Sequence, residues 1–284
     1  MNSHAYIGYS FQKLFIWKYW TLRRFLGEVR RTSVWSQKSE ILKTRSLKGS
    51  CEGPALIAAT GSSLGEVPDL VFEFFKNRNS IFGVNNYILS DKGVRFPPTY
   101  QFIIDNAFFR NRDLTTEKHS MASVISSVRP DYLVQVVGSQ DYLSNYPRIN
   151  IHGHVLPSFT KSIDPTKVCG FVPNTTLFAI SLAIYLGFSP IFVAGFDYDQ
   201  FKEAKVDLDL KGIYVEDISR FKSGLDRNIW EGRENSCDLF GSVAYLIETT
   251  KLFQAHDVKL IGDKGVIDTF KRISLDSLLQ FILR

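Results

Sequence analysis

The sequence predicts an α/β fold: a single Rossmann-like domain with a mostly parallel β-sheet covered by helices, plus a helical basic N-terminal arm. Three observations predict this fold class. Short apolar runs alternate with helical segments from Pro54 onward, which is the pattern of strands buried on both faces of a parallel sheet. The 284 residues are 44% hydrophobic, enough to build one large core. The positive charge is concentrated near the N-terminus.

The charge distribution separates the arm from the domain. Residues 1–50 hold ten Lys and Arg and two Asp and Glu, a net charge of +8. Because the whole chain carries +5, residues 51–284 carry −3. We therefore expect a basic amphipathic arm at 1–50 and the Rossmann-like domain at 51–284. A domain of negative charge does not favour nucleic acid as a partner.

The arm contains aromatic, aliphatic and basic side chains at roughly helical spacing over residues 11–31. That pattern suits a helix lying in a membrane interface. It also suits a helix docked on the domain or on another chain, so a homo-oligomer stays open. No apolar run has the roughly 18 residues that a membrane span needs. The three cysteines show no disulfide or zinc spacing, which favours a reducing cytoplasm. We expect a cytoplasmic protein that could be peripheral at the inner face of the cell membrane.

The first part of the domain alternates strand and helix. ALIAA (55–59) is a continuous apolar run of strand length, and VPDLVFEFFKN (67–77) has its apolar residues at helical spacing. SIFGVNNY (80–87) and TYQFIIDNAFF (99–109) are rich in β-branched and aromatic residues and then become polar. Both predict strands that run into loops.

The second part repeats this alternation. YLVQVV (132–137) predicts a strand, and TLFAISLAIYLGF (176–188) predicts a helix that is apolar on nearly all sides and therefore buried. The strand PIFVAGFDY (190–198), the helix SVAYLIETTKLFQAHD (242–257) and the strand VKLIG (258–262) close the series. Ligands of such sheets bind at the carboxyl ends of the strands, so we expect the functional residues there.

The turn after the first strand holds Thr60, Gly61 and Ser63 at the start of a helical segment. Their backbone N–H groups and hydroxyls could hold phosphate oxygens. Small residues also serve simply to turn the chain and cap a helix.

Polar residues also follow the next two predicted strands. Asn85 follows IFGV, and Asp105 and Asn106 follow QFII. An asparagine amide offers a donor and an acceptor, which suits the edge of a nucleobase or a ribose. The alternative for both stretches is an Asx-type turn.

Two further stretches hold candidate residues: the start of the apolar helix and the end of the strand at 190–198. Thr175 and Thr176 open the apolar helix and place small polar groups at its positive end. Gly195 would allow close approach of the backbone. Asp197 could accept hydrogen bonds from ribose hydroxyls or take part in acid–base chemistry, or it could cap the next turn.

Together these stretches resemble the bacterial sialyltransferases that use CMP-activated sialic acid. That family has a GNGPSL-type turn, a CNQ-type strand end, a TSG-led helix ending in LG, and an SGIDFY-type strand end. Here the corresponding stretches are ATGSSL, VNNY, NTTLFAISLAIYLG and AGFDYD, within residues 54–265. The archaeal 6-hydroxymethylpterin pyrophosphokinase-like domain shares the fold and a similar pattern. Proteins of bacterial surface-polysaccharide loci also look like this chain, including its segment 262–279.

The resemblance implies a donor site built from strand ends and one helix start. The first turn would meet the CMP phosphate and ribose, the second and third strand ends the nucleotide and donor sugar, and the last strand end the cytidine. The implied residues are Thr60, Gly61, Ser63, Asn85, Asp105, Asn106, Thr175, Thr176, Gly195, Asp197 and Tyr198. The usual Gly-Asn of the first turn is Ala59-Thr60 here, which keeps a hydroxyl and loses an amide.

The catalytic base departs from the family pattern. Arg233 stands where the resemblance implies a histidine, and an arginine cannot act as a base at neutral pH. It could bind a carboxylate or phosphate. Glu234 could act as the base if burial raised its pKa. His152 and His154 could supply a base from another loop, and no third ligand stands near them to indicate a metal site.

The resemblance implies that 51–284 is a sialyltransferase-type nucleotide-sugar-binding domain and that the protein is an inverting, metal-independent glycosyltransferase. It would transfer an acidic sugar from a CMP-activated donor, with no further cofactor, to a glycan or glycolipid acceptor in surface polysaccharide or lipooligosaccharide synthesis. One alternative is pyrophosphokinase-like phosphotransfer from ATP, which needs magnesium. Another is a non-catalytic relative that binds a nucleotide-sugar.

Overall fold

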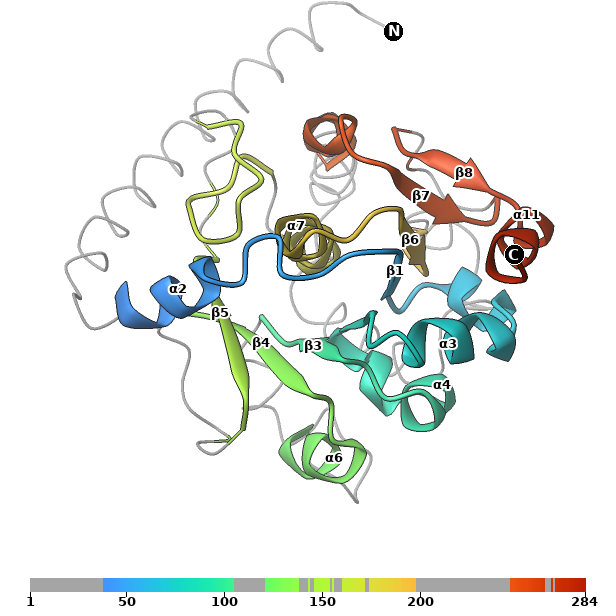
Figure 1. Ribbon diagram of the computed structural model, residues 1–284, viewed down its shortest axis with the longest axis horizontal. Coiled ribbons are helices and arrows are strands. Elements are labelled where there is room, and N and C mark those ends of the chain that lie inside the picture. The colour runs from blue at the N-terminus through green and yellow to red at the C-terminus, as the bar shows by residue number, and fades with distance from the viewer. Residues whose placement is uncertain are drawn as a thin grey trace, which may run out of the picture. The chain divides into compact units, whose positions relative to one another are not determined.

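The computed structural model describes residues 38–104, 121–137, 143, 146–153, 155, 160–171, 174–197, 246–263, 267 and 269–284. Within these ranges the strands form one eight-stranded sheet in the order β5-β4-β3-β2-β1-β6-β7-β8 (Figure 1). Every pairing is parallel. The predicted Rossmann-like α/β fold with a parallel sheet is therefore confirmed. The predicted membrane-interface segment 11–31 lies outside the described residues.

Six strands lie where the sequence predicts them, and the structure adds β5 and β8. The prediction that the strand at 258–262 closes the series is wrong, because β8 follows and pairs with β7. The strands are β1 (Ala55–Ala58), β2 (Ile81–Val84), β3 (Tyr100–Phe102), β4 (Tyr132–Val136), β5 (Arg148–Ile151), β6 (Ile191–Ala194), β7 (Val258–Ile261) and β8 (Lys271–Ile273).

Two strands end earlier than predicted because the backbone changes conformation. β2 ends at Val84, since Asn85 has a φ of 52° and starts a 3-10 turn. β6 ends at Ala194, since Gly195 has a φ of 72°. Both angles lie in the left-handed region, which interrupts an extended strand. The polar residues after these strands therefore belong to turns at the sheet edge.

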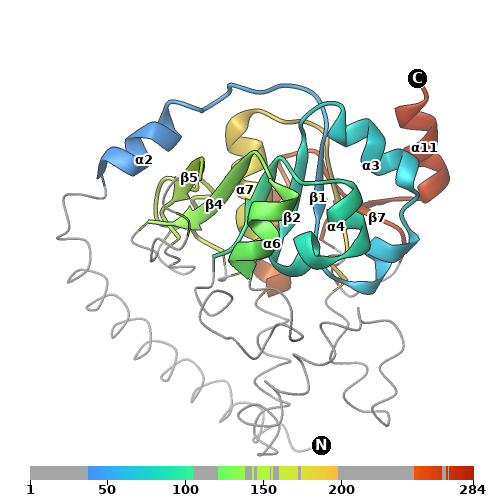
Figure 2. The ribbon, with the colours of Figure 1, turned by 90° about the horizontal axis from the view of Figure 1, so that it is seen from below.

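Helices cover both faces of the sheet. α7 contacts β1, β2 and β6, whereas α3 contacts β1 and β2 from the other face and also contacts α11. Figure 2 shows α3, α4 and α6 in front of the strands and α7 behind them. The described helices are α2 (Lys38–Arg45), α3 (Asp69–Lys76), α4 (Asp91–Arg95), α6 (Met121–Val128), α7 (Thr175–Leu186) and α11 (Leu275–Ile282), with 3-10 turns η2 (Ser62–Glu66), η3 (Asn85–Leu89) and η5 (Lys251–Phe253).

The buried strands divide their side chains between two apolar layers. In β1, Ala55 and Ile57 join the layer beneath α7, whereas Leu56 and Ala58 join the layer beneath α3. This alternation follows from the period-two geometry of a strand. All four residues are fully buried, so the continuous apolar run ALIA reflects a strand covered on both faces.

α7 is the central helix, and ten of its twelve residues are buried. The Asn174 side chain caps its start by accepting a hydrogen bond from Leu177 N at 3.2 Å. Gly187, with a φ of 106°, ends it in the left-handed conformation that glycine adopts easily. Asn174 stands just before the predicted helix 176–188, and Gly187 stands inside it and ends the helix at Leu186.

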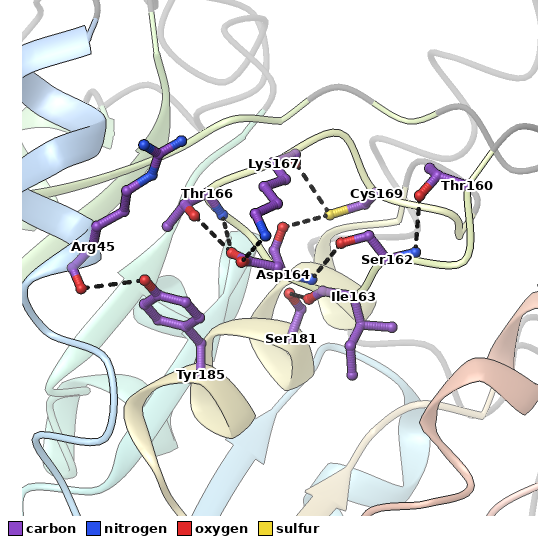
Figure 3. A network of polar contacts seen from close by, with 10 residues as sticks. All are labelled: Arg45, Thr160, Ser162, Ile163, Asp164, Thr166, Lys167, Cys169, Ser181 and Tyr185. Atoms are coloured by element: carbon purple, nitrogen blue, oxygen red, sulfur yellow. Dashed lines mark hydrogen bonds and ion pairs between the residues drawn. The ribbon is translucent and has the colours of Figure 1, made fainter.

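The segment 160–169 and α2 are both hydrogen-bonded to α7 (Figure 3). Ser181 donates to the Ile163 carbonyl, and Tyr185 donates to the Arg45 carbonyl at 3.3 Å. Asp164 accepts from the backbone N and the hydroxyl of Thr166. Residues 40–50, which the sequence analysis assigns to the arm, belong to one compact unit with the sheet.

None of the helices in the described ranges has the length and apolarity needed to cross a membrane.

Candidate functional site at the carboxyl edge of the sheet

The strand order reverses between β1 and β6. From β1 the chain adds β2, β3, β4 and β5 on one side, and it then returns to place β6 on the other side of β1. β1 pairs directly with both β2 and β6. In open parallel sheets, ligands bind outside the carboxyl ends of the strands at such a reversal.

Three predicted stretches meet at this edge because of the strand register. Ala58 pairs with Gly83 of β2 and with Ala194 of β6. Two residues further along each chain stand Thr60, Asn85 and Phe196. α7 runs antiparallel to β6 and so begins at the same edge. We call residues 60–63, 85, 174–176 and 195–197 the switch-point group.

Two glycines let the turn after β1 approach the end of β6. Gly61 N donates to Gly195 O at 2.8 Å. A Cβ on Gly61 would lie 2.5 Å from Gly195 O, and a Cβ on Gly195 would lie 2.4 Å from Ala59 O. Gly195 thus allows a close approach of backbone, as its sequence position suggests, and the partner is the protein's own first turn.

Ser63 and Asp197 bind each other across the strand reversal. Ser63 N donates to Asp197 Oδ2 at 2.8 Å, and Ser63 Oγ donates to Asp197 Oδ1 at 2.5 Å. Ser63 Oγ also accepts from Gly195 N at 3.0 Å. Ser62 Oγ adds a longer contact of 3.3 Å to Asp197 Oδ2. The buried Asp197 carboxylate, which follows β6, therefore caps η2, the helical turn that follows β1.

This pairing changes what the first turn offers to a ligand. The amide and hydroxyl of Ser63, which the sequence suggests for phosphate, already donate to a carboxylate. Asp197 is only 3% exposed. A carboxylate has about four acceptor sites, and Ser62 and Ser63 occupy three of them. Thr60 and Ser62 are the half-exposed hydroxyls of this turn.

Asn85 has a left-handed backbone and a buried side-chain oxygen. Its φ of 52° is left-handed, a region that asparagine tolerates better than most residues. Its backbone carbonyl accepts a hydrogen bond from Gln101 Nε2 at 2.9 Å. Its Oδ1 is buried and has no hydrogen-bond partner in the described part of the chain. An acceptor in this state suits a ligand that brings an N–H or O–H group.

The start of α7 supplies the positive end of a buried helix. Thr176 is 5% exposed and Thr175 is half-exposed. Asn174 satisfies Leu177 N through its side chain and Phe178 N through its carbonyl. The N–H groups at the very start of a helix have no acceptor within that helix, and with the helix dipole they favour an anion.

His152 lies well away from the switch-point group. It follows β5, and its N donates to Pro165 O at 2.7 Å. β5 is four strands from β1, which is about 19 Å at the usual strand spacing. The structure therefore does not bring His152 to the edge where β1 and β6 meet.

Several predicted residues lie outside the described residues, and so does the whole segment 198–245. They are Asp105, Asn106, His154, Tyr198, Arg233 and Glu234. Within the described ranges no three His, Cys, Asp or Glu side chains come together in a way that could hold a metal ion.

The sequence analysis missed Ser62 and Gln101. Gln101 is fully buried in β3, and a polar residue inside the apolar run TYQFII is the signal that could have found it. Ser62 stands next to a predicted site residue, but only the fold reveals its contact with Asp197.

The chain was compared with protein-family models, curated proteins and solved structures, and none of the three comparisons gave a match.

Proposed function

We propose that the protein is a glycosyltransferase that takes an acidic sugar from a CMP-activated donor and passes it to a glycan or glycolipid hydroxyl. The observation that carries this proposal is the convergence of the switch-point group at the strand reversal. The group combines an amide acceptor without a partner in the described residues, a helix start and the three half-exposed hydroxyls of Thr60, Ser62 and Thr175. These are the features that a nucleoside and its phosphate require.

The buried carboxylate of Asp197 decides how we orient the donor. A phosphate beside this carboxylate would meet electrostatic repulsion in a region of low dielectric constant. A ribose brings hydroxyl donors instead, and one of them could replace the long contact from Ser62 Oγ. We therefore assign the ribose, and not the phosphate, to the turn after β1.

The phosphate then belongs at the start of α7. The terminal N–H groups of a buried twelve-residue helix favour negative charge, and the Thr175 and Thr176 hydroxyls add two donors. The phosphodiester of a CMP-sugar has a single negative charge, whereas the triphosphate of ATP has several. The fixed carboxylate of Asp197 favours the donor of lower charge.

The reaction follows from this orientation. The acceptor hydroxyl attacks the anomeric carbon from the face opposite the phosphate, the bond to the phosphate oxygen breaks, and the sugar is inverted. Donors at the start of α7 stabilise the charge that develops on the departing CMP. The acceptor proton goes to a base, for which Glu234 and His154 remain the candidates.

A binding screen tests the proposal. CMP, UMP, GDP and ATP with Mg²⁺ are each added to the full chain, and the melting temperature is recorded. A ligand that binds only the folded state raises it. We expect the largest rise with CMP, and release of CMP from a CMP-activated acidic sugar when an acceptor is present. A larger rise with ATP would instead support phosphotransfer, and no rise with any nucleotide would overturn the proposal.

A pair of variants on α7 tests the assignment of the phosphate. Thr175→Val removes a hydroxyl at the helix start, and we expect CMP to bind about tenfold more weakly. Ser181→Ala is the matched control, because Ser181 lies on the same helix but bonds to Ile163 O. It should lower stability and leave CMP affinity unchanged. Equal affinities in all three proteins would exclude a role for Thr175.

A further inference from the structure

Gln101 holds the backbone of Asn85 from inside the sheet. Its side chain is fully buried, and its Nε2 donates to Asn85 O at 2.9 Å and to Phe102 O at 3.1 Å. A flipped amide would place its oxygen against both carbonyl oxygens, so these contacts fix its orientation. Gln101 therefore acts as a donor to the first residue beyond β2.

A glycine makes room for this contact. Gly83 of β2 pairs directly with Gln101 of β3. A Cβ on Gly83 would lie 2.6 Å from Gln101 Oε1 and 2.6 Å from Tyr87 Cδ1. The absence of a side chain at Gly83 thus lets the Gln101 side chain lie against β2 and reach Asn85, the first residue after that strand.

Asn85 combines a left-handed backbone with an unpaired side-chain oxygen. Its φ is 52°, a conformation that asparagine adopts more readily than most residues but that still gains from support by its surroundings. Its Oδ1 is buried without a partner in the described residues. A left-handed backbone combined with an unpaired acceptor is a property of ligand sites more than of simple turns.

We propose that Gln101 is a positioning residue for the donor site: it acts through Asn85 by fixing the left-handed backbone that presents the Asn85 amide to the nucleoside. This inference rests on the proposed function, because it requires that Asn85 contacts the donor. The role proposed for Gln101 does not require that it contacts the ligand, although its own Oε1 is also buried without a partner in the described residues. Its role is to keep the Asn85 amide in the orientation that accepts a hydrogen bond from an N–H or O–H group.

A double-mutant cycle tests the proposal through the dissociation constant of CMP, measured by calorimetry. Gln101→Met keeps the side-chain volume and removes the donor. Asn85→Gly removes the amide and accepts the left-handed backbone without strain. We expect each single variant to bind CMP about tenfold more weakly and the double variant to bind no more weakly than Asn85→Gly. Additive losses, or normal affinity in Gln101→Met, would overturn the proposal.

A matched control separates positioning from general stability. Gln135 is also a buried glutamine, on the neighbouring strand β4. Gln135→Met should change the melting temperature but not the CMP affinity, and a loss of affinity equal to that of Gln101→Met would contradict the proposal. If Gln101→Met does not fold, Gln101→Asn replaces it, because it keeps an amide that is one methylene too short to reach Asn85 O.

Hydrogen exchange in the absence of nucleotide tests the positioning role of Gln101 separately from the proposed glycosyltransferase function. We expect the amides of residues 84–88 to exchange faster in Gln101→Met than in the wild type. Unchanged exchange there would overturn the positioning role even if CMP binds. If the wild type binds no nucleotide, the proposed function fails, and the exchange rates alone decide whether Gln101 fixes Asn85.

Discussion

Ser63 and Asp197 are 134 residues apart in the chain, yet two hydrogen bonds of 2.5 and 2.8 Å join them. The pair ties the turn after β1 to the end of β6. These are the two strands between which the strand order reverses. A carboxylate that is 3% exposed thus sets the geometry of the edge where we propose that the donor binds.

Removal of the Asp197 carboxylate should destabilise the fold. Asp197→Ala leaves the buried Ser63 N–H and hydroxyl without their acceptor, and we expect a loss of about 2–3 kcal/mol in the free energy of unfolding. Urea denaturation at neutral pH measures it. Ser62→Ala is the control, because it removes only the 3.3 Å contact of a half-exposed hydroxyl, and it should cost less than about 1 kcal/mol. Equal losses in both variants would contradict this account.

Gly195 should not tolerate a side chain. Gly195→Ala places a Cβ 2.4 Å from Ala59 O and imposes a φ of 72° on an alanine, so we expect a loss of about 2 kcal/mol or more in stability. Gly65→Ala is the control, because Gly65 lies in η2, the turn that Gly195 approaches, and a Cβ there meets nothing within 4 Å. Thermal unfolding compares the two. Similar melting temperatures for both variants would exclude the steric argument.

The contacts of Asp69 should contribute a pH-dependent part of the stability. Hydrogen bonds from Lys92 and Arg95 hold the pKa of the Asp69 carboxyl below its ordinary value of 3.8. A depressed pKa in the folded state means that the stabilisation is present above about pH 3.8 and is lost as the pH falls below it.

Unfolding of the wild type and of Asp69→Asn between pH 7 and pH 2 tests this dependence. The difference between the two proteins should be constant at neutral pH and should shrink at the acidic end. In a Lys92→Met background the pH-dependent part should become smaller, because one of the two donors is gone. A difference that persists unchanged at the lowest pH would show that ionisation of Asp69 is not its source.

The two described cysteines should differ in reactivity. Burial raises the pKa of the Cys169 thiol to about 12, and the nearby Asp164 adds to the effect. Since the thiolate is the reactive form, Cys169 should resist alkylation at pH 8 in the folded protein. Cys51 is half-exposed and should react first. Peptide mapping after a short iodoacetamide pulse measures both, with a urea-unfolded sample as the control. Equal labelling of the two thiols in the folded protein would contradict the prediction.

The sequence predicted correctly the strands and the helix whose signals lie within a few residues of each other. ALIA and IFVA are continuous apolar runs because β1 and β6 are buried on both faces. The helix at 176–188 carries its own start and stop signals in Asn174 and Gly187. β8 was missed because KRI is short and charged, and only its pairing with β7 makes it a strand.

Strand ends were the hardest to place. In IFGVNNY the two asparagines after Val84 mark a polar strand end, but they do not show which residue leaves the extended conformation. The left-handed residue is Asn85, and its carbonyl accepts a hydrogen bond from Gln101, a residue of another strand. Hydrogen bonds between residues of different strands depend on the strand register, and a short stretch of sequence does not show that register.

The sequence by itself determined the parallel α/β architecture and the positions of the polar strand ends, because burial on two faces and helix capping act over a few residues. Only the tertiary structure decided how those ends are used. It directed the Ser63 donors to Asp197 and left the Asn85 oxygen without a partner among the residues that the structure describes. The physical reason is that hydrogen-bond partners at a sheet edge come from strands distant in sequence, so the sheet order selects which polar groups pair and which remain for a ligand.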